Sequence, residues 1–386
     1  MILLKRQFGE KASIDELERV AYSTDASQID GNAVAVVWPE NKEDVYKLVR
    51  YAHRKDMKIT PRGAGTGLVG SAVPQDSIVM DVSRMDRVIS IDIKSKTVIV
   101  EPGIVLDELN KALESHGLVF PVLPASHAVC TIGGMISTNA AGMRSVNYGR
   151  MIDWIDELEI IDGMGRMFNA KGDKIKNFCG TEGTIGIITK AKLNLTEPEN
   201  KRSMDYLKFE TINGMLKKYN SLAKDNLIAV EYINKSAAKL AGLAPYFHLF
   251  IEYKSMTGEI FNNNQIENIW DIRKQTGVKL SAEGYTLKED PKVPQDKIPD
   301  LMRWLEENEV PSFGHLGIGV IHPRFKDSKL IDEMYRLVLE LGGEVTGEHG
   351  IGLKKKKYMD YKLRERLTRL KASYDPKNIL NPGIMI

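Results

Sequence analysis

The residues with the clearest capacity for chemistry lie in two glycine-rich segments of the second half of the chain. One segment contains His315 and His322, and the other contains the adjacent pair Glu348 and His349. Two imidazoles and a carboxylate are a usual ligand set for a divalent ion such as zinc, manganese or iron. On one regular strand, positions 315 and 322 would face opposite sides and could not share an ion. The glycines between them permit a bulge or turn, so a metal site and a structural role both stay open.

A second candidate is the crowded glycine run over residues 58–70, which could wrap an anionic phosphate group. Glycine carries no side chain, so successive backbone N–H groups can approach phosphate oxygens closely. Gly65, Gly67 and Gly70 match the G-x-G-x-x-G fingerprint, but that motif requires a helix directly after the loop. The following residues instead predict a turn and an apolar strand over 77–83. We therefore reject a nicotinamide Rossmann site, and a ligand-free hairpin remains the alternative to a nucleotide-type cofactor.

The composition restricts the class of protein. The chain has 386 residues, 42% of them hydrophobic, which suits a folded protein of two domains. Its 54 basic and 52 acidic residues give a net charge of +2, so no overall field favours nucleic acid as a partner. No run resembles a signal peptide or a transmembrane segment, and we expect a cytoplasmic protein. Cys130 and Cys179 are too few for an iron–sulfur cluster and are expected to be buried thiols.

The elements that must position these residues follow an α+β pattern. A polar, proline-bearing segment at residues 196–202 predicts a boundary between residues 1–196 and 197–327. Residues 328–386 form a third segment, largely helical to residue 370. In the first part, strands are predicted over 34–38, 77–83, 88–93, 97–101, 157–161 and 185–195, and helices over 42–54 and 105–115. In the second part, helices are predicted over 212–224, 261–275 and 298–308, and strands over 229–233 and 248–253.

Three more small-residue segments, at residues 124–126, 131–142 and 180–189, can also present main-chain donors. Together with the glycine run, and in this order, they resemble the FAD-binding domain of the p-cresol methylhydroxylase (PCMH) and vanillyl-alcohol oxidase flavoproteins. The resemblance covers roughly residues 30–195. It implies an α+β fold: a two-part, PCMH-type FAD-binding domain with mixed sheets, and a smaller α+β substrate (cap) domain. It also implies non-covalent FAD, because Ala64 stands where some members carry a histidine for covalent attachment.

The resemblance assigns the cofactor contacts segment by segment. The first loop is implied to cradle the pyrophosphate, residues 124–142 to line the ribityl chain and isoalloxazine, and residues 182–188 to approach the adenine end. The closing segment also resembles the family, which implies that the tail returns to the FAD domain, although Ile384 replaces the family's lysine. The implied FAD-binding residues are Arg62, Gly63, Ala64, Gly65, Thr66, Gly67, Pro124, Ser126, Thr131, Gly134, Asn139, Gly142, Glu182, Gly183, Gly186, Ile188 and Asn381.

The histidine segments resemble the C-terminal part of the D-2-hydroxyacid dehydrogenase branch. That branch includes D-lactate and D-2-hydroxyglutarate dehydrogenases and the glycolate oxidase D subunit. The resemblance implies that His315, His322 and Glu348 bind a divalent metal and that His349 is the general base, with a pKa near neutral pH.

The resemblance also supplies cationic anchors for a carboxylate. Arg273 is implied to bind it as a bidentate fork, with Lys288 as a second point charge, although a surface role stays open for Lys288. Three positions depart from the branch pattern. Gly277 stands where the family often has a threonine, and Ile318 and Val320 replace Asp and Asn, which puts substrate identity in doubt.

The implied activity is FAD-dependent oxidation of a small D-2-hydroxy acid, D-lactate-like or glycolate, to the 2-oxo acid. Hydride would pass to flavin N5, and the electrons of the reduced flavin would then pass to a quinone, an electron-transfer flavoprotein, an iron–sulfur subunit, oxygen or an artificial dye. The alternatives are a non-catalytic electron-relay subunit, alkyl-glycerone-phosphate-type ether-lipid chemistry and sugar-alcohol oxidation. The basic run at residues 354–357 predicts a solvated face, with docking on an acidic acceptor or on the inner face of a membrane as the alternative. A homo-oligomer stays open.

Overall fold

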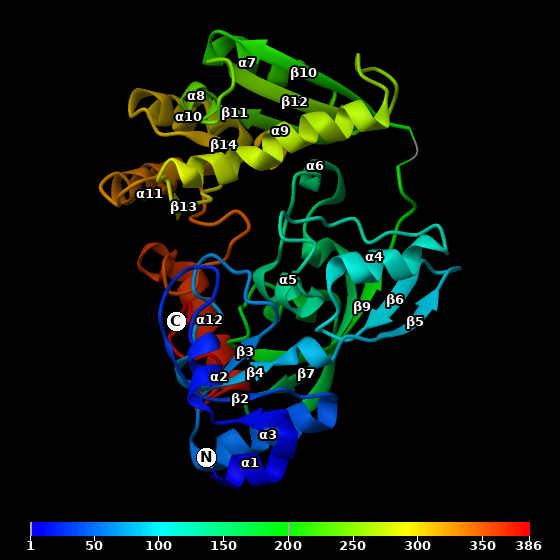
Figure 1. Ribbon diagram of the computed structural model, residues 1–386, viewed down its shortest axis with the longest axis vertical. Helices are drawn as coiled ribbons and strands as arrows, with labels where there is room; N and C mark the ends of the chain where they lie inside the picture. Colours follow the sequence, from blue (N-terminus) through cyan, green and yellow to red (C-terminus); the bar gives the residue numbers. More distant parts are fainter. Residues whose placement is uncertain (1, 200) are drawn as a thin grey trace.

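The computed structural model describes residues 2–199 and 201–386 and contains three β-sheets. Two sheets, of four and five strands, build the lower half of Figure 1, where both chain ends lie. A six-stranded sheet builds the upper half and is connected to the lower half through residues 194–203. The α+β class expected from the sequence is confirmed. No helix among residues 2–199 and 201–386 is both long and apolar enough to cross a membrane.

The four-stranded sheet carries the glycine run. Its strand order is β1-β2-β4-β3, with β2 and β3 both parallel to β4 and β1 antiparallel to β2. Because β3 and β4 are parallel, the glycine run between them is a crossover connection, which excludes the ligand-free hairpin. The elements are α1 (Ile2–Phe8), β1 (Ala12–Ser13), α2 (Glu16–Ala21), β2 (Asn32–Val37), α3 (Lys42–Lys55), β3 (Ile59–Arg62) and β4 (Gln75–Asp81).

The five-stranded sheet is antiparallel throughout, in the order β5-β6-β9-β7-β8. The sequence prediction missed α5, because its glycines and β-branched residues lower helix propensity. The side chain of Thr131 caps this helix by accepting from the N–H of Gly134. The elements are β5 (Val88–Asp92), β6 (Thr97–Val100), α4 (Leu106–Glu114), α5 (Ile132–Thr138), α6 (Ser145–Tyr148), β7 (Ile155–Asp162), β8 (Met167–Lys171) and β9 (Gly186–Asn194).

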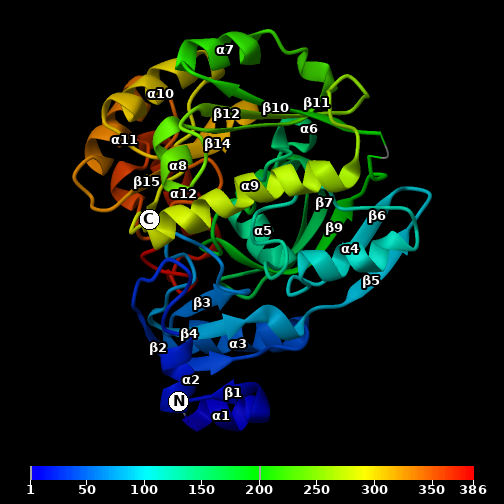
Figure 2. The same cartoon turned by 45° about the horizontal axis from the view of Figure 1, so that its top comes forward.

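The six-stranded cap sheet is antiparallel, in the order β10-β12-β11-β14-β15-β13. Helices α7, α10 and α11 pack on one face, whereas α8 and the long α9 pack on the other (Figure 2). The elements are β10 (Ser203–Phe209), α7 (Ile212–Asn220), β11 (Leu227–Ile233), α8 (Lys235–Leu240), β12 (Phe247–Tyr253), α9 (Asn263–Ala282), β13 (Leu287–Lys288), α10 (Ile298–Glu307), β14 (Ser312–His315), β15 (Val320–Phe325) and α11 (Ile331–Glu340).

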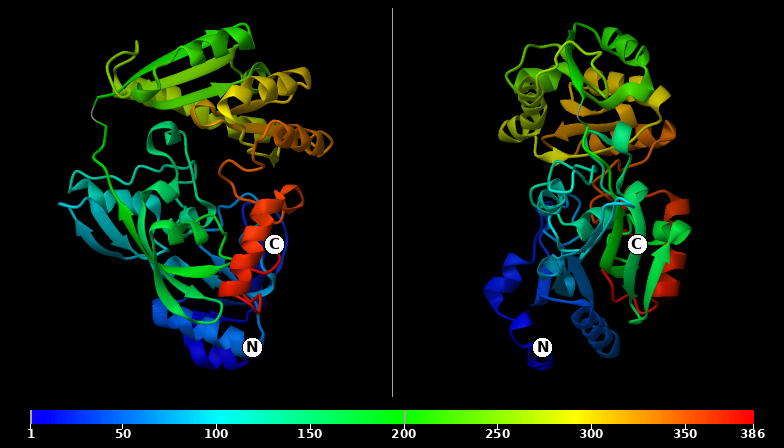
Figure 3. Two further views of the ribbon diagram at one scale, coloured as in Figure 1. Left: turned by 180° about the vertical axis from the view of Figure 1, so that it is seen from behind. Right: turned by 90° about the vertical axis from the view of Figure 1, so that its right-hand side faces the viewer.

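The last segment of the chain lies against the first part of the molecule. Helix α12 (Tyr361–Tyr374) runs alongside the lower half in Figure 3, and the Tyr374 ring packs on Phe168 and Phe178. Beyond it, the N–H of Ile59 donates to the carbonyl of Ile379 at 2.7 Å. The tail therefore continues the hydrogen bonding of strand β3, directly before the glycine run.

Candidate active site

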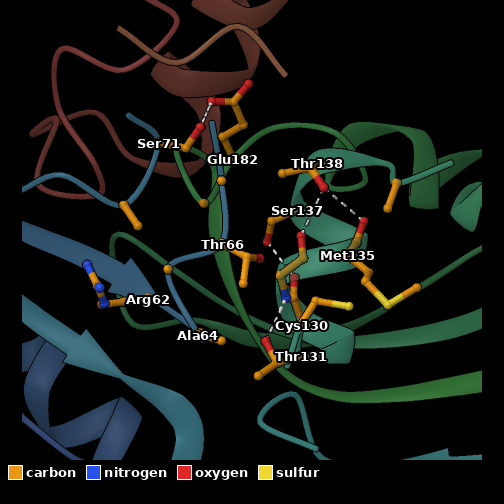
Figure 4. Close-up of a pocket in the computed structure, with 18 of the residues that line it drawn as sticks. Arg62, Ala64, Thr66, Ser71, Cys130, Thr131, Met135, Ser137, Thr138 and Glu182 are labelled. Atoms are coloured by element: carbon orange, nitrogen blue, oxygen red, sulfur yellow. Dashed lines mark hydrogen bonds between the residues drawn. The ribbon is translucent and has the colours of Figure 1, made fainter. Parts of the chain in front are cut away.

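A cavity of about 390 Å³ lies between the glycine run, helix α5 and the start of β9. Its volume falls in the range of small-molecule sites, and Glu348 and His349 form part of its wall. Figure 4 shows the segments converging on it. The predicted FAD-binding residues that line it are Arg62, Gly63, Ala64, Gly65, Thr66, Gly67, Pro124, Ser126, Thr131, Gly134, Glu182, Gly183, Gly186 and Ile188.

The glycine run needs its glycines because of close contacts. A side-chain carbon at Gly63 would lie 2.2 Å from Oγ1 of Thr131, the residue that caps α5. Gly65 has a φ of +67°, and a side chain there would meet the Arg62 guanidinium at 2.4 Å. The loop can therefore lie directly against the helix N-terminus and leave its backbone open to a phosphate group.

Three residues predicted to bind FAD do not line this cavity. Asn139 ends α5 with a φ of +51°, and its side chain accepts from the N–H of Ile152 at 3.0 Å. A side chain at Gly142 would meet the carbonyl of Leu123 at 2.1 Å, so that position supports chain packing. The Asn381 amide donates to the carbonyls of Ser71 and Glu182, at 2.8 and 2.7 Å. All three hold the walls of the cavity in place.

The Glu182 carboxylate is buried and joins the cavity wall to the chain's last segment. It accepts from Ser71 Oγ at 2.5 Å (Figure 4) and from the N–H groups of Ile351 and Gly352 at 2.6 and 2.9 Å. Burial raises the pKa of Glu182, although these donors favour the carboxylate. The side chain, predicted as a cofactor contact, is thus also a structural tie.

The two histidines of the cap sheet lie on neighbouring strands. In the β14–β15 hairpin, His315 pairs with Val320 and Phe313 pairs with His322, so both imidazoles project from the same face. Gly319, with a φ of +73°, makes the reversal that this requires. The imidazole ring centres are 4.9 Å apart. The argument that His315 and His322 would face opposite sides of a single strand, and so could not share an ion, therefore does not apply.

Glu348 completes the cluster. Its carboxylate oxygens lie 3.5 Å from Nε2 of His315 and 3.2 Å from Nε2 of His322. One donor atom from each of the three residues lies within 4.8 Å of the others. Two imidazole nitrogens and a carboxylate oxygen at this spacing fit a divalent ion.

Glu231 on β11 contacts Nδ1 of His315, the imidazole nitrogen that does not approach Glu348. Its Oε1 lies 2.5 Å from Nδ1 of His315, and its Oε2 lies 2.6 Å from the guanidinium of Arg273. A carboxylate behind an imidazole orients the opposite nitrogen toward an ion. Burial opposes the charged imidazole, but Glu231 and Glu348 raise the pKa of His315 to about 9. Sequence reasoning missed Glu231; its only signal was one acid within a strand of otherwise uncharged residues.

Asp290 positions the Glu-His segment through its backbone. Its Oδ2 accepts from the N–H groups of Gly347, Glu348 and His349 at 3.0, 2.7 and 2.7 Å. Its Oδ1 forms an ion pair with Lys355, which is fully buried. Sequence reasoning did not single out Asp290 as a site residue, since its partners lie far away in the chain.

His349 faces both the cavity and the cluster. Its Nδ1 is 3.3 Å from Oδ1 of Asp290, and its Nε2 is 3.3 Å from Oε1 of Glu348. Burial opposes protonation, but Asp290 and Glu348 raise the pKa of His349 to about 9. This upward direction differs from the near-neutral pKa that the resemblance implies for His349.

The two predicted carboxylate anchors lie on the cap side of the cluster. Arg273 on α9 is buried, pairs with Glu231, and its guanidinium carbon is 4.3 Å from the centre of the Phe313 ring. Lys288 on β13 is half-buried, and burial and Arg324 lower its pKa. Neither residue lines the cavity described above.

Arg324 on β15 is a cation that sequence reasoning missed. Burial and the neighbouring Arg273 lower its pKa to about 10, which leaves it charged at neutral pH. Its Nε and Nη1 atoms are buried and have no hydrogen-bond partner among residues 2–199 and 201–386.

Val320, one of the departures from the branch pattern, is buried and packs where a side chain at Gly347 would lie.

Comparison with known proteins identifies the family. The sequence matches the FAD binding domain family over residues 33–171 and the C-terminal domain of FAD linked oxidases over residues 255–385. The D-lactate dehydrogenase of Archaeoglobus fulgidus is 30% identical, over 91% of this chain and 91% of that protein. The chain belongs to the family of FAD-linked oxidases.

Other relatives of this chain carry related names. Glycolate oxidase subunit GlcD of Bacillus subtilis is 28% identical over 95% of this chain and 92% of its own length. A D-2-hydroxyglutarate dehydrogenase of Stutzerimonas stutzeri is 26% identical over 90% of both chains. A solved structure of alkyldihydroxyacetonephosphate synthase shares the fold, with a TM-score of 0.72 at 18% identity, over 99% of this chain and 84% of that one. The cavity between the glycine run, α5 and the start of β9 exposes backbone N–H groups of the glycine run, which suits the pyrophosphate of FAD.

Proposed function

We propose that this chain oxidises a D-2-hydroxy acid to the 2-oxo acid, with D-lactate and glycolate as the smallest candidates. One observation carries the proposal. Glu348 and His349 belong both to the wall of the FAD cavity and to the cluster formed with His315 and His322. A substrate held there would have its C2 carbon toward the cofactor and its hydroxyl toward the histidines. The relatives' names, which refer to D-lactate, glycolate and D-2-hydroxyglutarate, support the same class.

The proposed chemistry breaks two bonds of the substrate. Bound FAD would supply the acceptor for the hydride from C2, and a divalent ion on His315, His322 and Glu348 would polarise the hydroxyl oxygen. His349 takes the hydroxyl proton, and Asp290 stabilises the imidazolium that forms. The electron pair left on oxygen by the O–H bond forms the carbon–oxygen double bond of the 2-oxo acid as the hydride leaves C2.

The charges around the cluster support these roles. Asp290 and, to a smaller extent, Glu348 raise the pKa of His349. The positive charge of an ion on Glu348 would offset the second of these carboxylates and so shift His349 toward the neutral imidazole that a base requires. Lys288 attracts the C1 carboxylate from the cap side, beside Arg273, whose charge is balanced by Glu231. An external acceptor, such as a quinone, an electron-transfer flavoprotein or an iron–sulfur subunit, would then reoxidise the cofactor.

The test is anaerobic reduction of the flavin. FAD-loaded protein is mixed with D- and L-enantiomers of 2-hydroxy acids, and the visible absorbance of the flavin is followed. We expect bleaching by D-acids and not by their L-enantiomers. An electron-relay subunit without substrate chemistry would instead show no bleaching by any hydroxy acid, and that result would overturn the proposal.

A further inference from the structure

One face of the cap sheet gathers more positive charge than the proposed reaction uses. Arg324 lies two residues beyond His322 on β15, so the two side chains share a face. Lys288 pairs directly with Arg324 across β13 and β15, which places its side chain on that face too. The Phe313 ring, opposite His322, lies 5.1 Å from the guanidinium carbon of Arg324. Arg324 and Lys288 therefore lie beside the candidate metal cluster.

Helix α9 leaves space for the guanidinium of Arg324. A side-chain carbon at Gly277 would lie 3.2 Å from Nη2 of Arg324 and 3.2 Å from the Phe313 ring. Any larger residue at Gly277 would press on both groups. The absence of a side chain there lets Arg324 lie against the aromatic ring.

The nearby acids are engaged elsewhere. The two acids whose charges act on Arg324 are Glu289 and Glu348. Glu289 accepts from the Tyr335 hydroxyl and pairs with Lys355, and Glu348 contacts His315 and His322. Among residues 2–199 and 201–386, neither Lys288 nor Arg324 forms an ion pair. A buried guanidinium with unpaired N–H groups is costly in a folded chain unless an anion joins it.

We infer that the substrate carries a second anionic group and that Arg324 binds it. This inference rests on the proposed function and specifies its substrate class. Arg273 is already balanced by Glu231, which leaves the charges of Lys288 and Arg324 for the ligand. The C1 carboxylate carries one negative charge, which balances only one of these two positive charges. A D-2-hydroxy acid whose side chain ends in a carboxylate balances both, whereas the methyl group of D-lactate would leave the Arg324 guanidinium unpaired.

The experiment compares acids that differ only in the side chain. Anaerobic flavin reduction and steady-state kcat/KM are measured for D-lactate, D-malate and D-2-hydroxyglutarate. We expect at least one dicarboxylate to exceed D-lactate by about 10- to 100-fold, the usual effect of a charged hydrogen bond. A wild-type preference for D-lactate would overturn the inference and leave the proposed function standing.

Variants of Arg324 test whether this residue causes the expected preference for dicarboxylates. In Arg324→Gln the dicarboxylate-to-lactate ratio should fall by about 10- to 100-fold, and Arg324→Lys should recover part of it. Arg336→Gln, which changes an exposed arginine on α11, is the matched control and should keep the wild-type ratio. Equal losses for both acids in Arg324→Gln would mean that Arg324 holds the shared C1 carboxylate, which overturns the inference.

A binding measurement avoids dependence on turnover. Flavin absorbance is titrated with pyruvate and with a 2-oxo dicarboxylic acid in wild type and in Arg324→Gln, after flavin content and thermal unfolding are checked. Selective weakening of the dicarboxylate by about 10-fold or more supports the inference. If no hydroxy acid of either kind reduces the wild-type flavin, the proposed function fails and this inference fails with it.

Discussion

Glu182 accepts a hydrogen bond from the backbone N–H of Ile351 at 2.6 Å, although 169 residues separate the two. Glu182 belongs to the wall of the FAD cavity, whereas Ile351 follows the Glu348-His349 pair. The second carboxylate oxygen binds Gly352. This one side chain therefore fixes the distance between the cofactor cavity and the proposed base.

Glu182→Ala should destabilise the protein and displace His349. The change leaves the N–H groups of Ile351 and Gly352 buried without partners, which costs about 2–4 kcal/mol of unfolding free energy. Urea unfolding of the FAD-loaded protein measures the loss. Ser71→Ala, which removes one donor to the same carboxylate, is the milder comparison and should cost about 1 kcal/mol. Wild-type stability in Glu182→Ala would mean that the segment is held by other contacts.

Asp290 and Lys355 should behave as a coupled pair. Asp290→Asn removes the charge that compensates buried Lys355 and should cost about 3–5 kcal/mol. Lys355→Met should cost less, because the backbone donors of residues 347–349 still bind Asp290.

The double variant Asp290→Asn/Lys355→Met tests the coupling. It should recover part of the loss seen in Asp290→Asn, since no uncompensated charge remains. The free energies of unfolding of the four proteins form the double-mutant cycle. Additive losses would show that the two residues do not interact energetically.

The secondary structure was largely predictable because local pattern determines it. The apolar, β-branched run over 34–38 correctly placed β2, and apolar residues at helical spacing over 42–54 correctly placed α3. The strand predicted over 97–101 matches β6, and the helix predicted over 212–224 differs mainly in ending at Asn220. Helix α9, in contrast, extends beyond its predicted end to Ala282. Helix boundaries depend on tertiary contacts as well as on local sequence.

Site residues that belong to a recognisable local motif could be predicted from the sequence. Site residues that are brought together only by contacts between distant parts of the chain could not. The grouping of His315, His322 and Glu348 depends on the register of β14 with β15, which no local pattern encodes. Glu231 lies 84 residues from the histidine that it holds. A charged residue inside an apolar strand was the only available signal, and it does not name its partner.

Metal binding should require His322, whereas FAD binding should not. His322→Ala removes one of the three proposed ligands, so we expect the content of divalent metal per chain to fall close to zero. FAD content should persist, because His322 does not line the FAD cavity. Elemental analysis of dialysed protein measures the metal, with the exposed His116→Ala as control. Equal metal contents in wild type and His322→Ala would contradict the proposed site.

Gly65→Val should abolish FAD binding. The position has a φ of +67°, and the new side chain would meet the Arg62 guanidinium inside the loop that is proposed to wrap the pyrophosphate. Gly117→Val is matched in backbone strain, since its φ is +66°, but a side chain there meets nothing. The control should lose about 1–2 kcal/mol of stability and keep its flavin. Retention of flavin by Gly65→Val would show that the cofactor phosphates bind elsewhere.

His349→Ala should stop substrate oxidation while leaving the cofactor bound. The backbone N–H of residue 349 still donates to Asp290, so the segment keeps its position, and only the imidazole is lost. Without a base for the hydroxyl proton, the rate of anaerobic flavin reduction by a D-2-hydroxy acid should fall by about 10²- to 10⁴-fold. Stopped-flow absorbance gives the rate, and the flavin spectrum before mixing gives the cofactor content. A rate near that of the wild type, with full flavin content, would assign the proton transfer to another group, and the remaining titratable side chain of the cluster that faces the cavity is Glu348.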